Sequence, residues 1–265
     1  MRTLIAVSFI TTFLFMMVLS AQAALDPNLI LYFTFEEQLD GKMVKDMTGG
    51  GNDGRLRFGA KITKEPAEVQ KGVGALKLFN NVSAQLRVEE FDRMDKYGDN
   101  TYAFWIYIFN PMGARSSILK KANILVGEEK GSAPGIFLTD PGLALEYKFD
   151  DQGANAVGPD GKGKGFDLET WYHIVGVKKA SDLILYINGE EKGNFKVRRD
   201  FIQGKGQLRI GGTTSRAASF AMDEFQLYDR PLTAKEVTAV FKGIFLSVKP
   251  QAKLTTTWSH IKTSR

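Results

Sequence analysis

The sequence predicts an all-β domain, and two stretches carry most of that prediction. Residues 101–109, TYAFWIYIF, are aromatic or β-branched almost throughout, which is typical of a strand in the middle of a sheet. Residues 171–187 contain two further strand-like runs, and Asn188-Gly189 follows them directly. Asn-Gly is the strongest short hairpin signal, because a type I′ turn requires positive φ at both of its central residues. This region is therefore expected to form a β-meander.

The strand that begins at Trp171 is expected to be covered on both faces. Side chains alternate between the two faces of an extended chain, and apolar residues occur on both sides of residues 171–178. A strand with one solvated face would alternate apolar and polar residues instead. We therefore place this strand inside a sandwich and interpret Trp105, Trp171 and His173 as packing residues rather than as a sugar platform or a catalytic base.

Further strands are predicted from apolar runs that Gly, Pro and Asn signals separate. These runs are residues 29–35, 55–58, 75–79, 84–89, 117–120, 136–139, 143–149, 207–210 and 220–228. Thr233 and Glu236 have the spacing of a capping box, in which each side chain satisfies a free backbone donor of the helix start, so a short helix is expected over residues 234–241. Long loops are expected at residues 121–134 and 150–166.

The first 23 residues have the pattern of a cleaved signal peptide. Arg2 gives a positive start, residues 4–19 are mostly apolar, and Ala21 and Ala23 stand at the two positions that a signal peptidase reads. An uncleaved membrane anchor is the alternative, because the apolar run approaches the roughly 18 residues that span a bilayer. We expect cleavage after Ala23, hence a secreted, periplasmic or extracellular protein without a membrane span.

The rest of the chain is expected to form one domain, because no Gly/Pro/Ser-rich linker divides it. The predicted domain spans residues 25–243, and residues 244–265 form a basic, weakly ordered tail around Trp258. The absence of cysteine excludes disulfides, thiolate zinc sites and cysteine nucleophiles. The formal net charge is +5, but basic residues are scattered among acidic ones and form no long cluster, so no nucleic-acid partner is expected.

Seven short motifs occur in a characteristic order along the chain. They are YFTF at 32–35, Asp46 with GNDG at 51–54, FWI at 104–106, WYHI at 171–174, LYING at 185–189, LRIGG at 208–212 and MDEFQLY at 222–228. In this order they resemble the LamG-like (laminin G-like) domains of the concanavalin A-like lectin/glucanase superfamily in secreted bacterial proteins. The resemblance covers about residues 29–243 and implies a jelly-roll sandwich of two curved antiparallel sheets, here closed by the short C-terminal helix. This fold hosts lectins, carbohydrate-binding modules, adhesion domains and hydrolases, so it does not determine the ligand.

The resemblance also implies a structural calcium ion at the edge of the sandwich. Calcium prefers oxygen ligands, and the glycine-rich loop of residues 44–54 offers the side chains of Asp46, Asn52 and Asp53 together with glycine carbonyls. By the resemblance, Asp223 lies beside this loop. We therefore expect Asp46, Asn52 and Asp223 to bind calcium, with Glu36 as a further ligand. The alternative is that the loop is only a turn, with Asp46 as a local hydrogen-bond acceptor.

No catalytic residues are predicted. Glucanases of this fold carry paired carboxylates as Glu-x-Asp-x-Glu or a near variant on one strand, and this spacing is absent. Asp223 and Glu224 are adjacent, so we expect them on opposite faces of their strand. The only histidines are His173 and His260, and no Gly-x-Ser-x-Gly sequence accompanies them.

These observations predict an exported, non-catalytic binding domain that recognises extracellular carbohydrate or another surface ligand such as a protein. One alternative is a secreted carbohydrate-active hydrolase or lyase of the same superfamily. Another is a structural adhesion protein of the envelope that docks through Trp258 and the basic tail. The sequence does not identify the ligand-binding residues, but polar residues of the long loops are candidates for a glycan site. These are Asn123, Glu128, Asp150, Asp151, Gln152 and Asn155.

Overall fold

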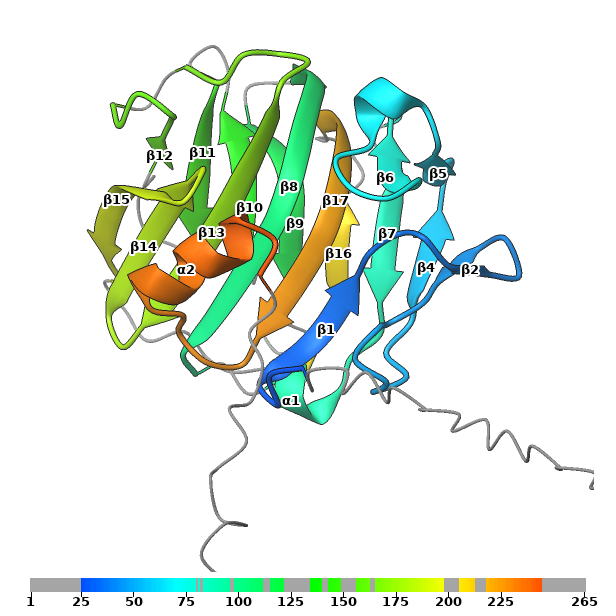
Figure 1. Ribbon diagram of the computed structural model, residues 1–265, viewed down its shortest axis with the longest axis horizontal. Helices are drawn as coiled ribbons and strands as arrows, with labels where there is room; N and C mark the ends of the chain where they lie inside the picture. The colour runs from blue at the N-terminus through cyan, green and yellow to red at the C-terminus, as the bar shows by residue number, and fades with distance from the viewer. Residues whose placement is uncertain are drawn as a thin grey trace, which may run out of the picture.

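The protein folds into a sandwich of two antiparallel sheets with a short C-terminal helix (Figure 1), as predicted for a jelly roll. The computed structural model describes residues 25–79, 81, 83–95, 98–111, 115–121, 134–139, 143–148, 156–162, 165–197, 205–212 and 218–244. The predicted signal peptide, and the predicted tail beyond its first residue, lie outside the described residues. None of the helices within the described residues is long and apolar enough to cross a membrane.

One sheet, called the front sheet here, carries the helix. Its strand order is β15-β14-β13-β8-β17-β6-β5, and β1 pairs with β17. The strands are β1 (Leu29–Phe33), β5 (Lys61–Thr63), β6 (Ala75–Leu78), β8 (Asn100–Pro111), β13 (Trp171–Lys179), β14 (Asp182–Ile187), β15 (Glu190–Lys196) and β17 (Ala218–Tyr228). The meander of β13, β14 and β15 is the one that the Asn-Gly signal predicts.

The other sheet, called the back sheet, has the order β12-β11-β10-β9-β16-β7-β4-β3-β2. Its strands are β2 (Gln38–Leu39), β3 (Met43–Val44), β4 (Gly54–Arg57), β7 (Gln85–Val88), β9 (Arg115–Lys121), β10 (Gly135–Thr139), β11 (Ala144–Lys148), β12 (Ala156–Val157) and β16 (Leu208–Gly211). Four short strands, β2, β3, β5 and β12, were not predicted from the sequence. Neither were two short helical turns, η1 (Pro66–Glu68) and α1 (Asp92–Asp95).

The turn between β14 and β15 confirms the hairpin prediction. Asn188 and Gly189 have φ of 51° and 81°, the positive values that a type I′ turn requires. The Asn188 side chain also binds the neighbouring strand, because its Oδ1 accepts a hydrogen bond of 2.9 Å from the backbone N–H of His173 on β13. The turn is thereby fastened to the neighbouring strand.

Strand β13 is buried on both faces, as its sequence predicts. On its inner face, Ile174 packs in the core between the two sheets. On its outer face, Val175 and Val177 belong to a second apolar cluster that includes Val237 and Val240 of the helix. Part of the outer face of the front sheet is therefore buried beneath α2.

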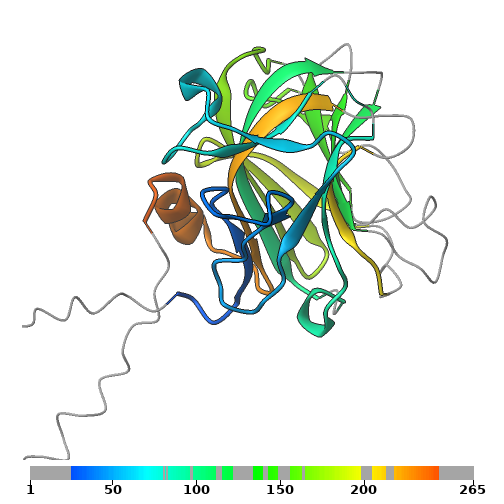
Figure 2. The same cartoon turned by 90° about the vertical axis from the view of Figure 1, so that its right-hand side faces the viewer.

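The helix α2 (Ala234–Phe241) lies on the outer face of the front sheet, on the side away from the back sheet (Figure 2). Its capping box is present: Thr233 Oγ1 accepts from the Glu236 N–H at 3.3 Å, and Glu236 Oε2 accepts from the Thr233 N–H at 2.8 Å. The helix prediction over residues 234–241 is thus confirmed, including its first turn.

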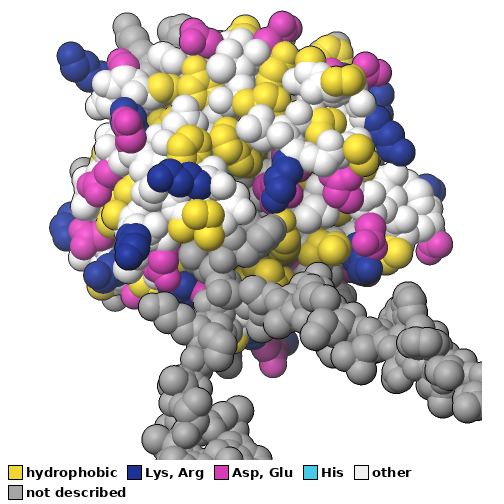
Figure 3. All heavy atoms as spheres, viewed as in Figure 1, with side chains coloured by type: hydrophobic (Ala, Val, Ile, Leu, Met, Phe, Trp, Pro, Cys, Tyr) yellow, Lys and Arg dark blue, Asp and Glu magenta, His cyan; other side chains and the backbone are white. Residues whose placement is uncertain are grey.

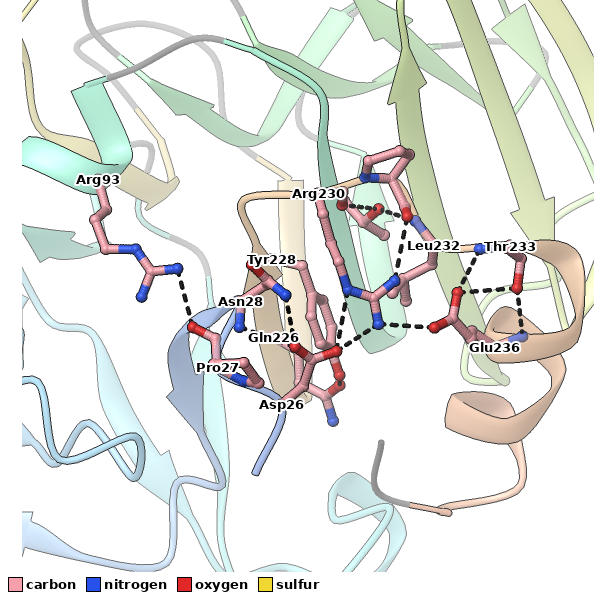
Figure 4. Close-up of polar contacts among 12 residues, drawn as sticks. Asp26, Pro27, Asn28, Arg93, Gln226, Tyr228, Arg230, Leu232, Thr233 and Glu236 are labelled. Atoms are coloured by element: carbon pink, nitrogen blue, oxygen red, sulfur yellow. Dashed lines mark hydrogen bonds and ion pairs between the residues drawn. The ribbon is translucent and has the colours of Figure 1, made fainter. Parts of the chain in front are cut away.

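Arg230 joins the beginning of the domain to α2 (Figure 4). Its guanidinium donates to Asp26 Oδ2, with the Nε bond at 3.0 Å, and to Glu236 Oε1 at 2.7 Å. Asp26 is buried, and Arg230 and Glu236 are partly buried, so these charge-assisted bonds are stronger than those of fully exposed ion pairs. They fix the position at which α2 starts, and so the part of the sheet that it covers.

Candidate functional site

The helix α2 covers only one end of the outer face of the front sheet. Trp105 and Trp171 project outward from β8 and β13, where Trp171 pairs with Tyr107 and His173 with Trp105. The helix has eight residues and ends at Phe241, so it does not cover the whole 12-residue strand β8. Trp105 and Trp171 are only partly buried. The prediction that both tryptophans lie in the core is therefore wrong.

Beyond the end of α2, four aromatic rings form a continuous row, called the aromatic strip here: Phe79, Phe109, Tyr107 and Trp171. Neighbouring ring centroids are 5.3 Å, 5.2 Å and 5.4 Å apart in that order. Phe79 is 46% exposed, and the other three rings are partly exposed. Hydrophobic side chains gather on this face of the molecule (Figure 3). The strip is an apolar surface that the described part of the fold leaves partly open.

Polar contacts hold the strip in place. Lys77 Nζ lies 5.1 Å and 5.0 Å from the ring centroids of Phe79 and Phe109, and it is ion-paired with Glu68. The Trp171 indole N–H donates to the carbonyl of Ala67 at 3.3 Å. The cation near the strip is thus balanced by a carboxylate, and the segment around η1 is anchored to the strip.

A β-bulge in β17 brings two carboxylates to the outer face of the front sheet. The register with β8 shifts between Asp223 and Gln226, and Glu224 has φ of 51°. Met222 and Phe225 point into the core, so both residues between them project outward. The expectation that Asp223 and Glu224 lie on opposite faces is wrong, because strict alternation fails at a bulge.

Asp223 holds a turn of the chain against the sheet. Its Oδ2 accepts from the backbone N–H groups of Gln70 and Lys71 at 3.1 Å and 2.9 Å, and its Oδ1 accepts from the Glu224 N–H at 2.8 Å. The side chain is fully buried. Burial, together with the neighbouring Glu224 carboxylate, raises the pKa of Asp223 to about 7 although the backbone N–H groups favour its ionised form. Asp223 is therefore positioned to shape the site rather than to meet a ligand.

A pocket of about 200 Å³ lies where α2 ends on the sheet, and it is called the helix-end pocket here. It is lined by Gln70, Lys71, Trp105, His173, Glu224, Gln226 and residues 240–244. Oε2 of Glu224 accepts hydrogen bonds from the Tyr32 hydroxyl at 2.7 Å and from Lys71 Nζ at 3.1 Å. The pocket thus has a polar wall on β17 and an aromatic wall on β8.

His173 is packed, as predicted. It is 2% exposed, and its ring centroid lies 5.0 Å from Trp105 and 5.6 Å from Phe241. Its Nδ1 has no hydrogen-bond partner among the described residues. Burial lowers the pKa of His173 to about 3, so the imidazole is neutral at pH 7. This histidine supplies a wall of the pocket and no positive charge.

The residues expected to bind calcium have other partners. Oδ1 of Asp46 accepts from the backbone N–H groups of Tyr32 and Thr48, and Oδ2 accepts from the Asn52 N–H and the Thr48 hydroxyl. Asp46 N–H in turn donates to Asp53 Oδ1 at 2.8 Å. Asp46 therefore closes its own loop, which is the alternative that the sequence analysis left open.

No polar contact within the described residues joins Asp46 or Asn52 to Asp223, and Glu36 accepts from the N–H groups of Val73 and Gly74. The part of the chain that the structure describes contains no group of three acidic or histidine side chains that could hold a metal ion. N–H donors occupy several of the positions around these carboxylates that a cation would need, so the carboxylates have hydrogen-bond partners without an ion. Calcium binding by these residues stays a prediction.

The six polar loop candidates, Asn123, Glu128, Asp150, Asp151, Gln152 and Asn155, lie outside the described residues. The residues of the aromatic strip and the helix-end pocket were not predicted as a site. The position of α2 on the front sheet decides how far Trp105 and Trp171 are covered, and it left no local signal in the sequence. The bulge that brings Glu224 to the outer face left none either.

The family model of the concanavalin A-like lectin/glucanases superfamily matches residues 80–238, more than half of the chain. No curated protein matches the chain. Solved structures share its fold at low sequence identity. Trypanosoma rangeli sialidase in complex with the inhibitor DANA is 16% identical, with a TM-score of 0.62 over 80% of this chain and 32% of the sialidase.

Two toxin domains are also similar. The binding domain of botulinum neurotoxin serotype D is 14% identical, with a TM-score of 0.60 over 82% of this chain and 52% of that domain. The binding domain of Paraclostridial Mosquitocidal Protein 1 is 18% identical, with a TM-score of 0.59 over 82% of this chain and 52% of that domain. The chain therefore spans between a third and about half of these structures, and identities this low show the fold alone.

Proposed function

Because the chain belongs to the concanavalin A-like lectin/glucanases superfamily, we propose that it is a non-catalytic domain that binds carbohydrate through the outer face of its front sheet. The observation that carries this proposal is the aromatic strip. Aromatic rings with one open side offer apolar area to the C–H groups of a sugar at a low cost in side-chain entropy. The strip thus supplies the contact area that a flat, neutral glycan needs.

The surroundings of the strip support an uncharged glycan over a charged one. Lys77, the cation over two of its rings, is neutralised by Glu68. An acidic polysaccharide would need a free cation there, and Lys77 would have to leave its carboxylate to serve as one. The predicted signal peptide supports an extracellular ligand. A surface protein is the other partner class, and a protein-binding result without glycan binding would favour it.

A hydrolase is the second candidate, and the bulge is the observation that favours it. It places Asp223 and Glu224 on the same face, and neighbouring carboxylates of which one has a raised pKa, here Asp223, are a common acid–base arrangement. However, both oxygens of Asp223 are engaged by three backbone N–H groups in a fully buried site. A proton transfer from Asp223 to a ligand would disrupt the turn that it holds, so we propose no catalytic role.

A glycan array combined with a reducing-sugar assay tests the proposal. The full chain is screened against neutral and acidic glycans, and each bound glycan is then incubated with the chain. We expect binding to neutral glycans without release of reducing ends. Release of product would replace the proposal with the hydrolase, and the absence of any glycan binding would remove it.

A further inference from the structure

The helix-end pocket contains one hydrogen-bond acceptor and one donor that the described protein does not use. Oε2 of Glu224 has two partners, whereas its Oε1 accepts no hydrogen bond within the described residues. Oε1 of Gln226 accepts from the Tyr228 hydroxyl at 2.7 Å, whereas its Nε2 donates to none of the described residues. The Gln226 residue is only 6% exposed. Both side chains line the pocket, so the unused acceptor and donor are available to a ligand that enters it.

The two free groups are arranged for a hydroxyl-rich ligand. Glu224 and Gln226 project from the same face of β17, two positions apart, and both line the pocket. A hydroxyl group donates one hydrogen bond and accepts others, so neighbouring hydroxyls can donate to a carboxylate and accept from an amide. A carboxylate or phosphate ligand would instead place an anion against Glu224.

The other walls and the size of the pocket suit one ring. Trp105 and Phe241 add aromatic surface to the pocket lining, with ring centroids 5.6 Å apart. Lys71 is ion-paired with Glu224, and Lys242 is exposed at the rim. The volume of about 200 Å³ is below the roughly 300–1,000 Å³ of pockets for larger ligands, so the pocket has room for a single ring.

We propose that the helix-end pocket binds one uncharged sugar ring, with Glu224 accepting from and Gln226 donating to its hydroxyls beside the ring of Trp105. This inference rests on the proposed function and specifies it. Trp105 precedes Tyr107 of the aromatic strip by two residues on the same face of β8. The pocket would hold a terminal sugar, while the strip contacts the rest of the glycan.

The three tryptophans of the chain allow the pocket and the strip to be tested separately. In the full chain labelled with ¹⁵N-tryptophan, Trp105 reports on the pocket and Trp171 on the strip. Single Trp→Phe variants assign the three indole signals. The probes are the methyl glycosides of glucose, galactose and mannose, with N-acetylneuraminic acid as the anionic comparison. We expect at least one neutral glycoside to shift the Trp105 signal saturably and to leave Trp171 unchanged.

The other outcomes distinguish the two proposals. If glycans shift only the Trp171 signal, the pocket inference is wrong and the proposed function stands. If N-acetylneuraminic acid shifts Trp105 and the neutral glycosides do not, the ligand class is wrong. If neither the glycosides nor neutral polysaccharides shift either signal, both proposals fail.

A matched pair of variants tests the role of the carboxylate. Glu224→Gln keeps the size of the side chain and removes its charge, and it should weaken binding of the active glycoside about tenfold, as expected for a lost charge-assisted hydrogen bond. Glu191→Gln is the control, because Glu191 also accepts from a tyrosine hydroxyl, that of Tyr186, on the same sheet but does not line the pocket. Thermal melting verifies that both variants fold. Equal affinities of the two variants would overturn the assignment of Glu224.

Discussion

The buried imidazole of His173 should make the free energy of unfolding depend on pH, and the substitution His173→Leu should remove this contribution. Burial lowers the pKa of His173 from 6.5 to about 3. Between these two pH values the unfolded chain binds a proton that the folded chain does not, so stability falls as the pH falls. Each pH unit contributes about 1.4 kcal/mol, and the effect between pH 6.5 and pH 4 is therefore about 3 kcal/mol.

Asp223 acts in the opposite direction in the same window. Its pKa is raised from 3.8 to about 7, so the folded chain retains a proton that the unfolded chain releases, and stability falls as the pH rises. The two contributions largely cancel in the native protein between pH 4 and pH 6.5. A comparison of two proteins that both contain Asp223 removes its contribution.

The perturbation is His173→Leu, which keeps an apolar side chain against Trp105 and Phe241. Urea unfolding of both proteins at pH 4, 5, 6 and 7 gives the difference in free energy of unfolding. We expect the variant to gain about 3 kcal/mol relative to the native protein as the pH is lowered from 6.5 to 4. A difference that is the same at every pH would refute the assignment of a neutral, buried imidazole.

Three further substitutions test the fold. Gly211→Ala should lower the free energy of unfolding by at least about 2 kcal/mol, because Gly211 has φ of 106° and an added Cβ would lie 2.4 Å from Leu78; urea unfolding measures the loss. Arg230→Met should cost about 2 kcal/mol by leaving buried Asp26 unpaired, and a loss below 0.5 kcal/mol would contradict the role of Arg230 as an anchor. Asp46→Ala should lower the melting midpoint equally in calcium and in EDTA, because the side chain closes its loop by hydrogen bonds. A midpoint that falls only in calcium, together with a calcium-dependent midpoint of the native chain, would instead support the predicted metal site.

The strands and the helix could be predicted because their signals are local. The apolar residues on both faces of the strand at Trp171, the Asn188-Gly189 turn and the capping box at Thr233 are each recognised from a few neighbouring residues. Each prediction is confirmed in the structure. Even the double coverage of β13 follows from its composition, although the sequence does not show that α2 is the element that covers the outer face.

The candidate site depends on relations that are not local. Trp105 and Trp171 resemble core residues in sequence, but their exposure depends on where α2 ends on the sheet. That position depends in turn on the bonds of Arg230 to Glu236 and to Asp26, which is distant in sequence. The bulge at Glu224 arises from the pairing of β17 with β8, so alternation alone misplaced that side chain. Asp46 has the carboxylate that calcium prefers as a ligand, but its oxygens accept hydrogen bonds from N–H groups that only the folded chain brings near.

The most direct test of carbohydrate binding by the front sheet is affinity gel electrophoresis in neutral polysaccharides with two matched variants. Phe79→Ala removes an exposed ring of the aromatic strip, and Phe58→Ala removes a phenylalanine of similar exposure, 51% against 46%, beside the back sheet. We predict that the polysaccharide retards the native chain and Phe58→Ala equally and retards Phe79→Ala much less. Equal retardation of all three proteins would contradict binding at the aromatic strip.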